Sequence, residues 1–237
     1  MAYASADRAC IYLGLGMQRY ENGGNTIRSI DALAAITGNI GKKGSGVNFA
    51  AKGMKKYLNG VEAALSDNKP DVRRFSISRM AGFLGQADDP PVKAAFVSSA
   101  NPLNQGPDVG QAVKQFSAID FKVVFDHFMT DTAAQADIIL PAASVFEQED
   151  IFCTVMFSPV LTYSHQALAP PAGLMTEFDF YIALADRMGI DLGFKTTDVY
   201  LRAAVSPLLK KLDISYGNLK TGLITLPGSE VAWEEKK

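Results

Sequence analysis

Cysteine and histidine are scarce in this sequence, and their scarcity excludes several kinds of metal site. The 237 residues contain two cysteines, Cys10 and Cys153, and two histidines, His127 and His165. Neither cysteine has a second cysteine or a histidine at the short spacing of zinc and iron–sulfur sites, so we predict no metal site in this chain. Free, buried thiols are the favoured interpretation because free cysteine packs as a small hydrophobic residue, and a disulfide is the open alternative.

Long apolar runs and blocks of like charge are also missing. The 23 basic and 25 acidic residues give a formal net charge of -2, which provides no basic field for a phosphate backbone, so nucleic acid is not an expected partner. No stretch of about 18 apolar residues occurs, and the first eight residues lack the pattern of an export signal. We therefore predict neither a membrane span nor a signal in this chain, and the cellular compartment stays undetermined. The 48% hydrophobic content is enough for a buried core.

The first 50 residues alternate apolar segments with glycine. Ala9–Leu13 is a short apolar run that predicts a buried strand, and Gly14-Leu15-Gly16 follows at its carboxyl end. Glycines there allow a ligand to approach backbone N–H groups, although an ordinary turn uses the same residues. The third glycine of a dinucleotide fingerprint is absent, and Gln18 stands where a helix would begin.

A helix is predicted after this turn, with Asn25 as its N-cap and Gly38 as its end. Its apolar face consists of Ile27, Ile30, Leu33, Ala34 and Thr37. The segment Gly38–Gly46 is too rich in glycine for regular structure.

From Val92 onward, strands and helices alternate. The strand Ala94–Val97, the helix Asp108–Phe116 and the strand Phe121–Phe125 form a β-loop-α-β unit whose strands are expected to be parallel. The other predicted elements are short helices at Met54–Leu65, Ser76–Leu84 and Thr130–Ala136, a strand at Ile138–Leu140, short strands or extended segments at Phe152–Phe157 and Leu161–Ala167, a helix capped by Thr176 and followed by Gly189, a helix at Asp198–Leu212 broken or kinked at Pro207, and a frayed end at Ser229–Lys237. The predicted fold class is α/β, with a mainly parallel sheet flanked by helices in a three-layer, Rossmann-like arrangement with irregular additions.

Polar residues follow two of these strands. Asn101 lies in the loop after the first strand, and Asp126, His127 and Thr130 follow the next strand. Ligands of open parallel sheets bind beyond the carboxyl ends of the strands, so both loops are expected to face one crevice. The Asp126 carboxylate can accept two hydrogen bonds from a guanine edge, and Thr130 can cap a helix or contact a phosphate. The alternative, which the residues alone favour, is that Asn101 and Asp126 only satisfy loop amides.

Other candidate groups are weaker. Glu147, Glu149 and Asp150 are interpreted as a solvated cluster at a helix end rather than as a catalytic or metal site, because no histidine accompanies them. His127 is a candidate to line the crevice, whereas His165 is interpreted as structural. No arrangement of a nucleophile with a base is recognisable, so we assign no catalytic residue.

Taken together and in order, these segments resemble the molybdopterin oxidoreductases of the dimethyl sulfoxide reductase family. The most specific stretch joins an aspartate, a threonine-rich turn and an Ala-Asp-Ile-Ile-Leu-Pro strand. The resembling segments are Gly14-Leu15-Gly16-Met17-Gln18-Arg19, Asn22–Ile30, Leu33–Gly41, Gly44-Ser45-Gly46, Asn101-Pro102, Asp126–Ala133, Ala136–Pro141 and Glu147-Gln148-Glu149-Asp150.

The resemblance implies a role in holding one of two pyranopterin guanine dinucleotides that carry molybdenum or tungsten. The expected cofactor-binding residues, to which Asn101 and His127 are added from the shared crevice, are Gly14, Leu15, Gly16, Gln18, Asn101, Asp126, His127 and Thr130. Residues 1–50 are expected to end one nucleotide-binding lobe, residues 51–190 to form an α/β cofactor-binding domain, and residues 191–237 to form a helical extension toward a further domain.

The sequence also departs from the family pattern. The metal ligand and the cysteine motif for an iron–sulfur cluster lie upstream of the matched region in the family, and a barrel-like domain begins about where Leu226-Pro227-Gly228 stands. Ile151–Met156 lacks the usual Gly-Thr and Gly-Arg pattern, so no substrate-side residue is assigned there.

We therefore expect an internal part of a large catalytic subunit that is inactive by itself. Its expected partners are the remaining domains of that subunit, with an electron-transfer subunit as a further candidate, and any iron–sulfur cluster would be bound outside this chain. The alternative is a stand-alone, non-catalytic nucleotide-binding or assembly module.

Overall fold

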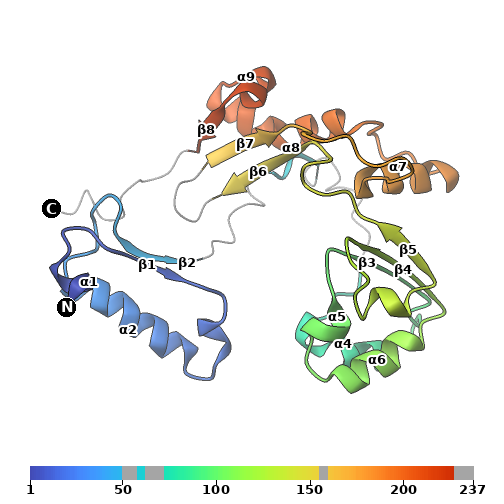
Figure 1. The fold of residues 1–237 in the computed structure, drawn as a ribbon, viewed down its shortest axis with the longest axis horizontal. Coiled ribbons are helices and arrows are strands. Elements are labelled where there is room, and N and C mark those ends of the chain that lie inside the picture. Colours follow the sequence, from blue (N-terminus) through green and yellow to red (C-terminus); the bar gives the residue numbers. More distant parts are fainter. Residues whose placement is uncertain (50–57, 62–71, 155–159, 227–237) are drawn as a thin grey trace. The chain divides into compact units, whose positions relative to one another are not determined.

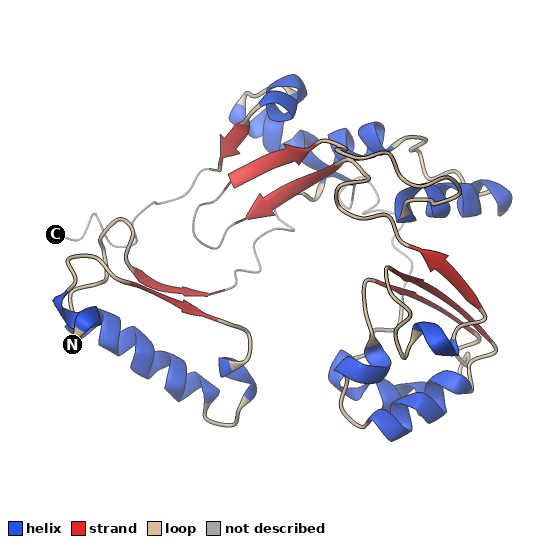
Figure 2. Cartoon of the chain, viewed as in Figure 1, coloured by secondary structure: helices blue, strands red, loops and turns tan. Residues whose placement is uncertain are grey.

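A computed structural model describes residues 1–49, 58–61, 72–154 and 160–226 (Figure 1). The chain divides into two compact units. Unit 1 comprises Met1–Val61, Ile151–Tyr163 and Arg202–Lys237, and unit 2 comprises Glu62–Asp150 and Ser164–Leu201. Both units combine helices with strands (Figure 2), so the predicted α/β class is confirmed. The expected helix at Met54–Leu65 and the frayed end lie largely outside the described residues.

Unit 2 is built on a sheet of three parallel strands. The strands β3 (Ala94–Ser98), β4 (Phe121–Asp126) and β5 (Ile138–Pro141) lie in the order β3-β4-β5. Val97 is paired with Val124, and Val124 with Ile139. Each predicted strand of this unit is present, extended by one residue at its carboxyl end. Because all three run the same way, β3, β4 and β5 end at one edge of the sheet.

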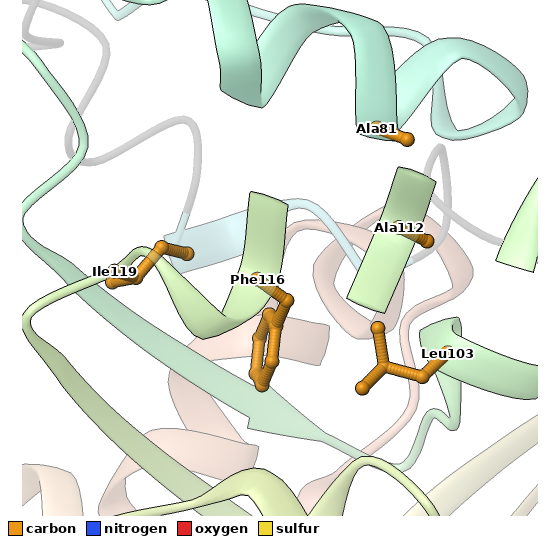
Figure 3. Close-up of a cluster of buried hydrophobic side chains, with 5 residues drawn as sticks. All are labelled: Ala81, Leu103, Ala112, Phe116 and Ile119. Carbon is orange, nitrogen blue, oxygen red and sulfur yellow. The ribbon is translucent and has the colours of Figure 1, made fainter. Parts of the chain in front are cut away.

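Helices cover both faces of this sheet. The helices α4 (Met80–Gln86), α5 (Pro102–Gln105) and α6 (Val109–Ser117) gather on one side of it in Figure 1. They enclose a buried cluster of five residues, shown in Figure 3 and consisting of Ala81, Leu103, Ala112, Phe116 and Ile119. Ala95 and Val97 of β3 pack against this cluster.

The opposite face of the sheet meets α7 (Glu177–Arg187). Phe125 of β4 contacts Phe180 of α7 with ring centroids 4.8 Å apart, and Phe96 of β3 lies 6.3 Å from the same ring. Phe96 and Phe125 alternate with Val97 and Val124, and successive strand residues point to opposite faces. The sheet of unit 2 therefore lies between two helical layers, as the sequence predicts.

Local capping residues set where the helices of unit 2 begin. The Asp108 side chain accepts a hydrogen bond from the backbone N–H of Gln111 and caps α6, and the Thr176 hydroxyl accepts one from that of Asp179 and caps α7, as predicted for Thr176. Ser76–Leu84 forms a 3₁₀ turn, Ile77–Arg79, followed by α4. The short helix α5 was not predicted.

An ion pair between the buried Lys122 and the exposed Asp137 joins the amino ends of β4 and β5. The Lys122 side chain donates a hydrogen bond to the Ile119 carbonyl oxygen at 2.8 Å and lies 3.1 Å from an Asp137 carboxylate oxygen. The same Asp137 oxygen accepts a hydrogen bond from the Lys122 backbone N–H at 2.7 Å. These hydrogen bonds hold the pKa of Asp137 below its ordinary value.

The amino-terminal part of unit 1 contains a strand, a turn and a helix. The strand β1 (Cys10–Leu13) pairs in parallel with β2 (Gly46–Phe49), and α2 (Gly23–Ile36) joins them. The buried Asn39 holds this arrangement, because its Oδ1 accepts a hydrogen bond from the Ala9 N–H at 2.8 Å. The short helix α1 (Ala2–Ser5) precedes β1.

Three predictions for this region are corrected. The strand β1 is largely exposed rather than buried, since it pairs with one other strand and only Leu13 is buried. The segment Gly38–Gly46 was predicted to lack regular structure because of its glycine content, but its last residue, Gly46, begins the strand β2. The helix α2 begins after Asn22, because Gly23 packs against the turn before it, where a Cβ would lie 2.7 Å from the Met17 carbonyl oxygen.

The remaining elements form a third sheet and a helical segment. The strands β6 (Asp150–Thr154), β7 (Val160–Ser164) and β8 (Leu223–Thr225) lie in that order, and β7 pairs with β8 in antiparallel fashion. The helix α8 (Thr197–Leu212) contains Pro207, and α9 (Tyr216–Thr221) follows. The sequence predicted α8 but neither α9 nor β8. The strands of the described ranges thus belong to three sheets rather than to one.

Cys10 is exposed and Cys153 is buried, and both are free thiols. The predicted free state is confirmed for both, and the predicted burial only for Cys153. Within the described ranges, no helix has the length and apolar character needed to cross a membrane.

Candidate functional site

Polar side chains gather where β3 and β4 end. Asp126 is the last residue of β4, and Asn101, His127, Thr130 and Thr132 lie in the segments that leave this edge of the sheet; we call these five residues the carboxyl-edge site. The first loop turns sharply at Ser99, whose φ of 52° lies in the region that favours glycine. Sequence reasoning expected both loops to face one crevice, and hydrogen bonds between them show that they lie side by side.

Asp126 organises the second loop. Its Oδ1 accepts a hydrogen bond from the Phe128 N–H at 3.1 Å, and its Oδ2 accepts one from the Thr130 hydroxyl at 3.5 Å. The Thr130 oxygen in turn accepts a hydrogen bond from the Ala133 N–H at 3.2 Å, at the start of the 3₁₀ turn Ala133–Gln135. Asp126 therefore satisfies loop groups, as the alternative interpretation proposed, and it uses two of the roughly four acceptor positions of a carboxylate.

Asn101 links the two loops. Its Oδ1 accepts hydrogen bonds from the Thr132 hydroxyl at 2.7 Å and from the Thr132 N–H at 3.3 Å. Its Nδ2 group donates to none of the described residues. The carbonyl half of this amide therefore holds the loops together, while the donor half is available for another partner.

His127 is exposed, and its ring lies 6.5 Å from that of Phe128. Phe128 and Met129 beside it are 78% and 71% exposed. Hydrogen bonds from Ser144, and then the charge of the nearby His127, hold the pKa of Glu147 below its ordinary value.

The acidic residues after β5 do not end a helix, contrary to the prediction. Glu147 closes a turn, because its Oε2 accepts a hydrogen bond from the Ser144 N–H at 2.8 Å. Glu149 lies 4.0 Å from the His165 Nδ1, and Asp150 begins β6. The described residues contain no group of three or more histidine, cysteine or acidic side chains arranged to hold a metal ion.

Two further polar groups at this edge were missed by sequence reasoning. The Ser98 hydroxyl, at the end of β3, donates a hydrogen bond of 2.5 Å to Glu177, the first residue of α7. The second is the Thr132 hydroxyl, which accepts a hydrogen bond from the Leu103 N–H at 3.2 Å. The available sequence signal was the pair Thr130 and Thr132 in the turn after a strand, and only Thr130 was predicted as a site residue.

The remaining predicted residues belong to unit 1. Gly14, Leu15 and Gly16 follow β1, and Gln18 lies in the 3₁₀ turn Met17–Arg19. A Cβ at Gly14 or Gly16 would meet no atom within 4 Å, and neither glycine has a positive φ. The local backbone therefore does not require glycine at either position, and both stand open to an incoming group.

Comparison with known proteins identifies the family of this chain. The model of the family described as molybdopterin oxidoreductase matches residues 2–187. The chain belongs to the molybdopterin oxidoreductase family. The resemblance read from the sequence is therefore confirmed.

Proteins from several organisms are similar to it. Probable oxidoreductase YyaE of Bacillus subtilis is 35% identical over 94% of the chain and 34% of its own length. Formate dehydrogenase H of Escherichia coli is 28% identical over 82% of the chain and 30% of its own length. Trimethylamine-N-oxide reductase of Haemophilus influenzae is 22% identical over 98% of the chain and 31% of its own length. The chain thus spans about a third of the length of these relatives.

The fold is also shared with a solved structure. Acetylene hydratase from Pelobacter acetylenicus superposes with a TM-score of 0.54 at 21% identity, over 73% of this chain and 25% of that one. This likeness concerns the fold.

Proposed function

We propose that this chain serves in the catalytic subunit of a molybdenum or tungsten oxidoreductase and supplies a half-site for a molybdopterin guanine dinucleotide. The observation that carries the proposal is the Asp126 carboxylate at the end of β4, with acceptor positions left over after its loop bonds. When bound, the cofactor supplies two-electron chemistry at its metal, often with transfer of an oxygen atom. The protein residues supply position and electrostatics.

The acceptor geometry of Asp126 fits a guanine edge. Guanine presents two adjacent N–H donors, and a carboxylate accepts such paired donors through two oxygens. The loop bonds from Phe128 and Thr130 come from one backbone amide and one hydroxyl, so they orient the carboxylate and leave one acceptor position on each oxygen. The Nδ2 donor of Asn101 suits the sugar and phosphate oxygens of a nucleotide, and the Thr130 oxygen, whose hydrogen is donated to Asp126, can accept a hydrogen bond from a sugar hydroxyl.

The glycine turn of unit 1 fits close approach of a cofactor. Because a side chain at Gly14 or Gly16 would meet no protein atom, the fold itself does not explain the glycines. Backbone approach by a ligand does explain them. We therefore retain Gly14, Leu15, Gly16 and Gln18 as proposed cofactor-binding residues, together with Asn101, Asp126, His127 and Thr130.

Family membership also supports the proposed partners. Because the chain corresponds to about a third of each relative, we propose that it works with the remaining domains of such a subunit and turns over no substrate by itself. An electron-transfer subunit and an iron–sulfur cluster held elsewhere are compatible with this role. Family membership favours the enzyme over a stand-alone nucleotide-binding module.

A nucleotide series tests the guanine half-site on the full 237-residue chain. GDP, IDP and ADP are titrated by NMR, since IDP lacks the 2-amino donor of guanine and ADP lacks both donors on this edge. Loss of one hydrogen bond to a charged acceptor costs about 1.5–3 kcal/mol, so IDP is expected to bind at least about tenfold more weakly than GDP. ADP is expected to bind more weakly still.

Two matched variants locate the effect. Asp126→Asn should remove the preference for GDP, because an amide presents a donor where guanine also donates. Asp120→Asn is the control, since Asp120 precedes β4 at the opposite end of the strand and is exposed beside Lys93. Equal binding of the three nucleotides, or an unchanged preference in Asp126→Asn, would contradict the half-site.

A further inference from the structure

The Thr132 side chain joins three segments of unit 2 beneath the carboxyl-edge site. It is fully buried, and its hydroxyl donates to Asn101 Oδ1 at 2.7 Å while accepting from the Leu103 N–H at 3.2 Å. Its backbone N–H donates to the same Asn101 oxygen at 3.3 Å. One hydroxyl therefore connects the loop after β3, the first turn of α5 and the loop after β4.

Apart from these contacts, the loop between Asp126 and Thr132 is held by local backbone hydrogen bonds, from the Thr130 N–H to the Phe128 carbonyl oxygen and from the Ala134 N–H to the Thr130 carbonyl oxygen, each 2.9 Å long. Phe128 and Met129 are largely exposed, so apolar packing does not fix this segment. Inside the loop, the Thr130 to Asp126 hydrogen bond is 3.5 Å long, at the outer limit for such a bond. A second hydrogen bond, from the Asn104 side chain of α5 to the Asp131 carboxylate in the loop after β4, lies on the surface, where water competes for the amide and the carboxylate.

The far end of the loop, in contrast, is anchored in the core. Leu103, beside the Thr132 hydroxyl, is a member of the buried cluster of α4, α5 and α6. Ala133, next to Thr132, is also fully buried. The polar contacts of Thr132 are thus made where water is excluded, and buried hydrogen bonds hold their geometry more firmly than exposed ones.

We propose that Thr132 is a positioning residue that fixes the Asp126 loop through Asn101 and Leu103. The role of the loop, which is to present Asp126 and Thr130 to a guanine nucleotide, rests on the proposed function. The positioning of the loop by Thr132 does not. We call the hydrogen bonds of Thr132 with Asn101 and Leu103 the latch, and Asn101 takes part in it through its Oδ1. Thr132 itself does not contact the ligand.

Amide hydrogen exchange of the full chain tests the latch without any ligand. Thr132→Val keeps the shape of the side chain and removes its hydroxyl, whereas Thr132→Ser keeps the hydroxyl. We expect the Phe128 and Ala133 amides, which bond to Asp126 and Thr130, to exchange about tenfold faster in Thr132→Val and at the wild-type rate in Thr132→Ser. Asn101→Ala removes the Oδ1 acceptor of the half-buried Asn101 side chain and should accelerate exchange of the same two amides. This variant therefore tests the latch independently if Thr132→Val folds poorly.

Asp137→Asn separates positioning from general destabilisation. It weakens the Lys122 pair at the amino ends of β4 and β5, so it should lower the melting temperature of unit 2 without accelerating exchange at Phe128. Unchanged exchange in Thr132→Val and Asn101→Ala, or equal acceleration in Asp137→Asn, would overturn the latch.

GDP titration of the same variants connects the latch to the proposed half-site. Well below the melting temperature, Thr132→Val should bind GDP about tenfold more weakly, and Thr132→Ser and Asp137→Asn should bind as the wild type does. If the wild type binds no GDP, the proposed half-site fails while the exchange experiment still decides the latch. If the wild type and Thr132→Val bind GDP equally, the latch has no positioning role and the half-site stands.

Discussion

Truncation of Leu103 is expected to destabilise unit 2 more than any surface change near it. Leu103 is 1% exposed, and it lies in the buried cluster with Ala112 and Phe116 of α6. Leu103→Ala removes the transfer free energy of the lost methyl and methylene groups and leaves a cavity where the neighbours cannot fully collapse. Buried leucines replaced in this way lose about 3 kcal/mol of unfolding free energy.

The expected loss can be converted into a melting shift. In domains of moderate size, 1 kcal/mol shifts the melting temperature by about 3–5 °C, so Leu103→Ala should lower it by about 10–15 °C. Far-UV circular dichroism during heating measures this shift, and urea titration gives the free energy independently. A change in the urea midpoint with an unchanged slope would identify a pure loss of stability.

Val109→Ala is the matched control for Leu103→Ala. Val109 begins α6 in the same region of unit 2 but is 49% exposed, so its truncation should change stability by less than about 0.5 kcal/mol. The cluster of α4, α5 and α6 would not be the core of this unit if both variants lost the same stability, or if Leu103→Ala lost less than about 1 kcal/mol.

Two further predictions concern the packing of α2 and the Lys122–Asp137 ion pair at the amino ends of β4 and β5. Gly23→Ala should cost about 1–3 kcal/mol in thermal melts, because its Cβ would lie 2.7 Å from the Met17 carbonyl oxygen. Gly24→Ala, which meets no atom within 4 Å, should instead stabilise α2 by about 0.5–1 kcal/mol, and equal effects would refute the packing argument. The pKa of Asp137 is lowered in the folded chain by its hydrogen bonds with Lys122, so its stabilising contribution is present above about pH 4 and is lost as the pH falls through the folded pKa. Melting temperatures measured between pH 6 and pH 3 should fall more steeply in the wild type than in Asp137→Asn, and parallel curves would contradict the assignment.

Short apolar runs and local caps explain why unit 2 was predictable. Its central strand contains the apolar run Val123-Val124-Phe125 because helices cover both faces of the sheet. Asp108 and Thr176 cap their helices through bonds to residues three positions away, which a sequence displays directly. The rule that parallel strands end at one edge then places Asn101 and Asp126 in neighbouring loops.

The errors arose where a distant neighbour decides the outcome. The burial of β1 depends on how many strands pair with it, and no pattern within Cys10–Leu13 reports that number. The start of α2 depends on the close approach of Gly23 to Met17, and β2 depends on pairing with β1. The bond between Glu147 and Ser144, in contrast, is local, and it formed a turn where a helix end was expected.

The sequence by itself determined the α/β class, the parallel strands of unit 2, the family and the edge at which polar residues gather. These follow from periodicity, caps and motif order, which are properties of neighbouring residues. Only the tertiary structure decided that Asp126 keeps free acceptor positions, that Asn101 is turned toward Thr132 and that Thr132 is buried between two loops and α5. Hydrogen-bond partners and burial are set by segments some 30 residues apart in the chain, as in the Thr132 to Asn101 bond, and physical contact between such segments exists only once the chain has folded.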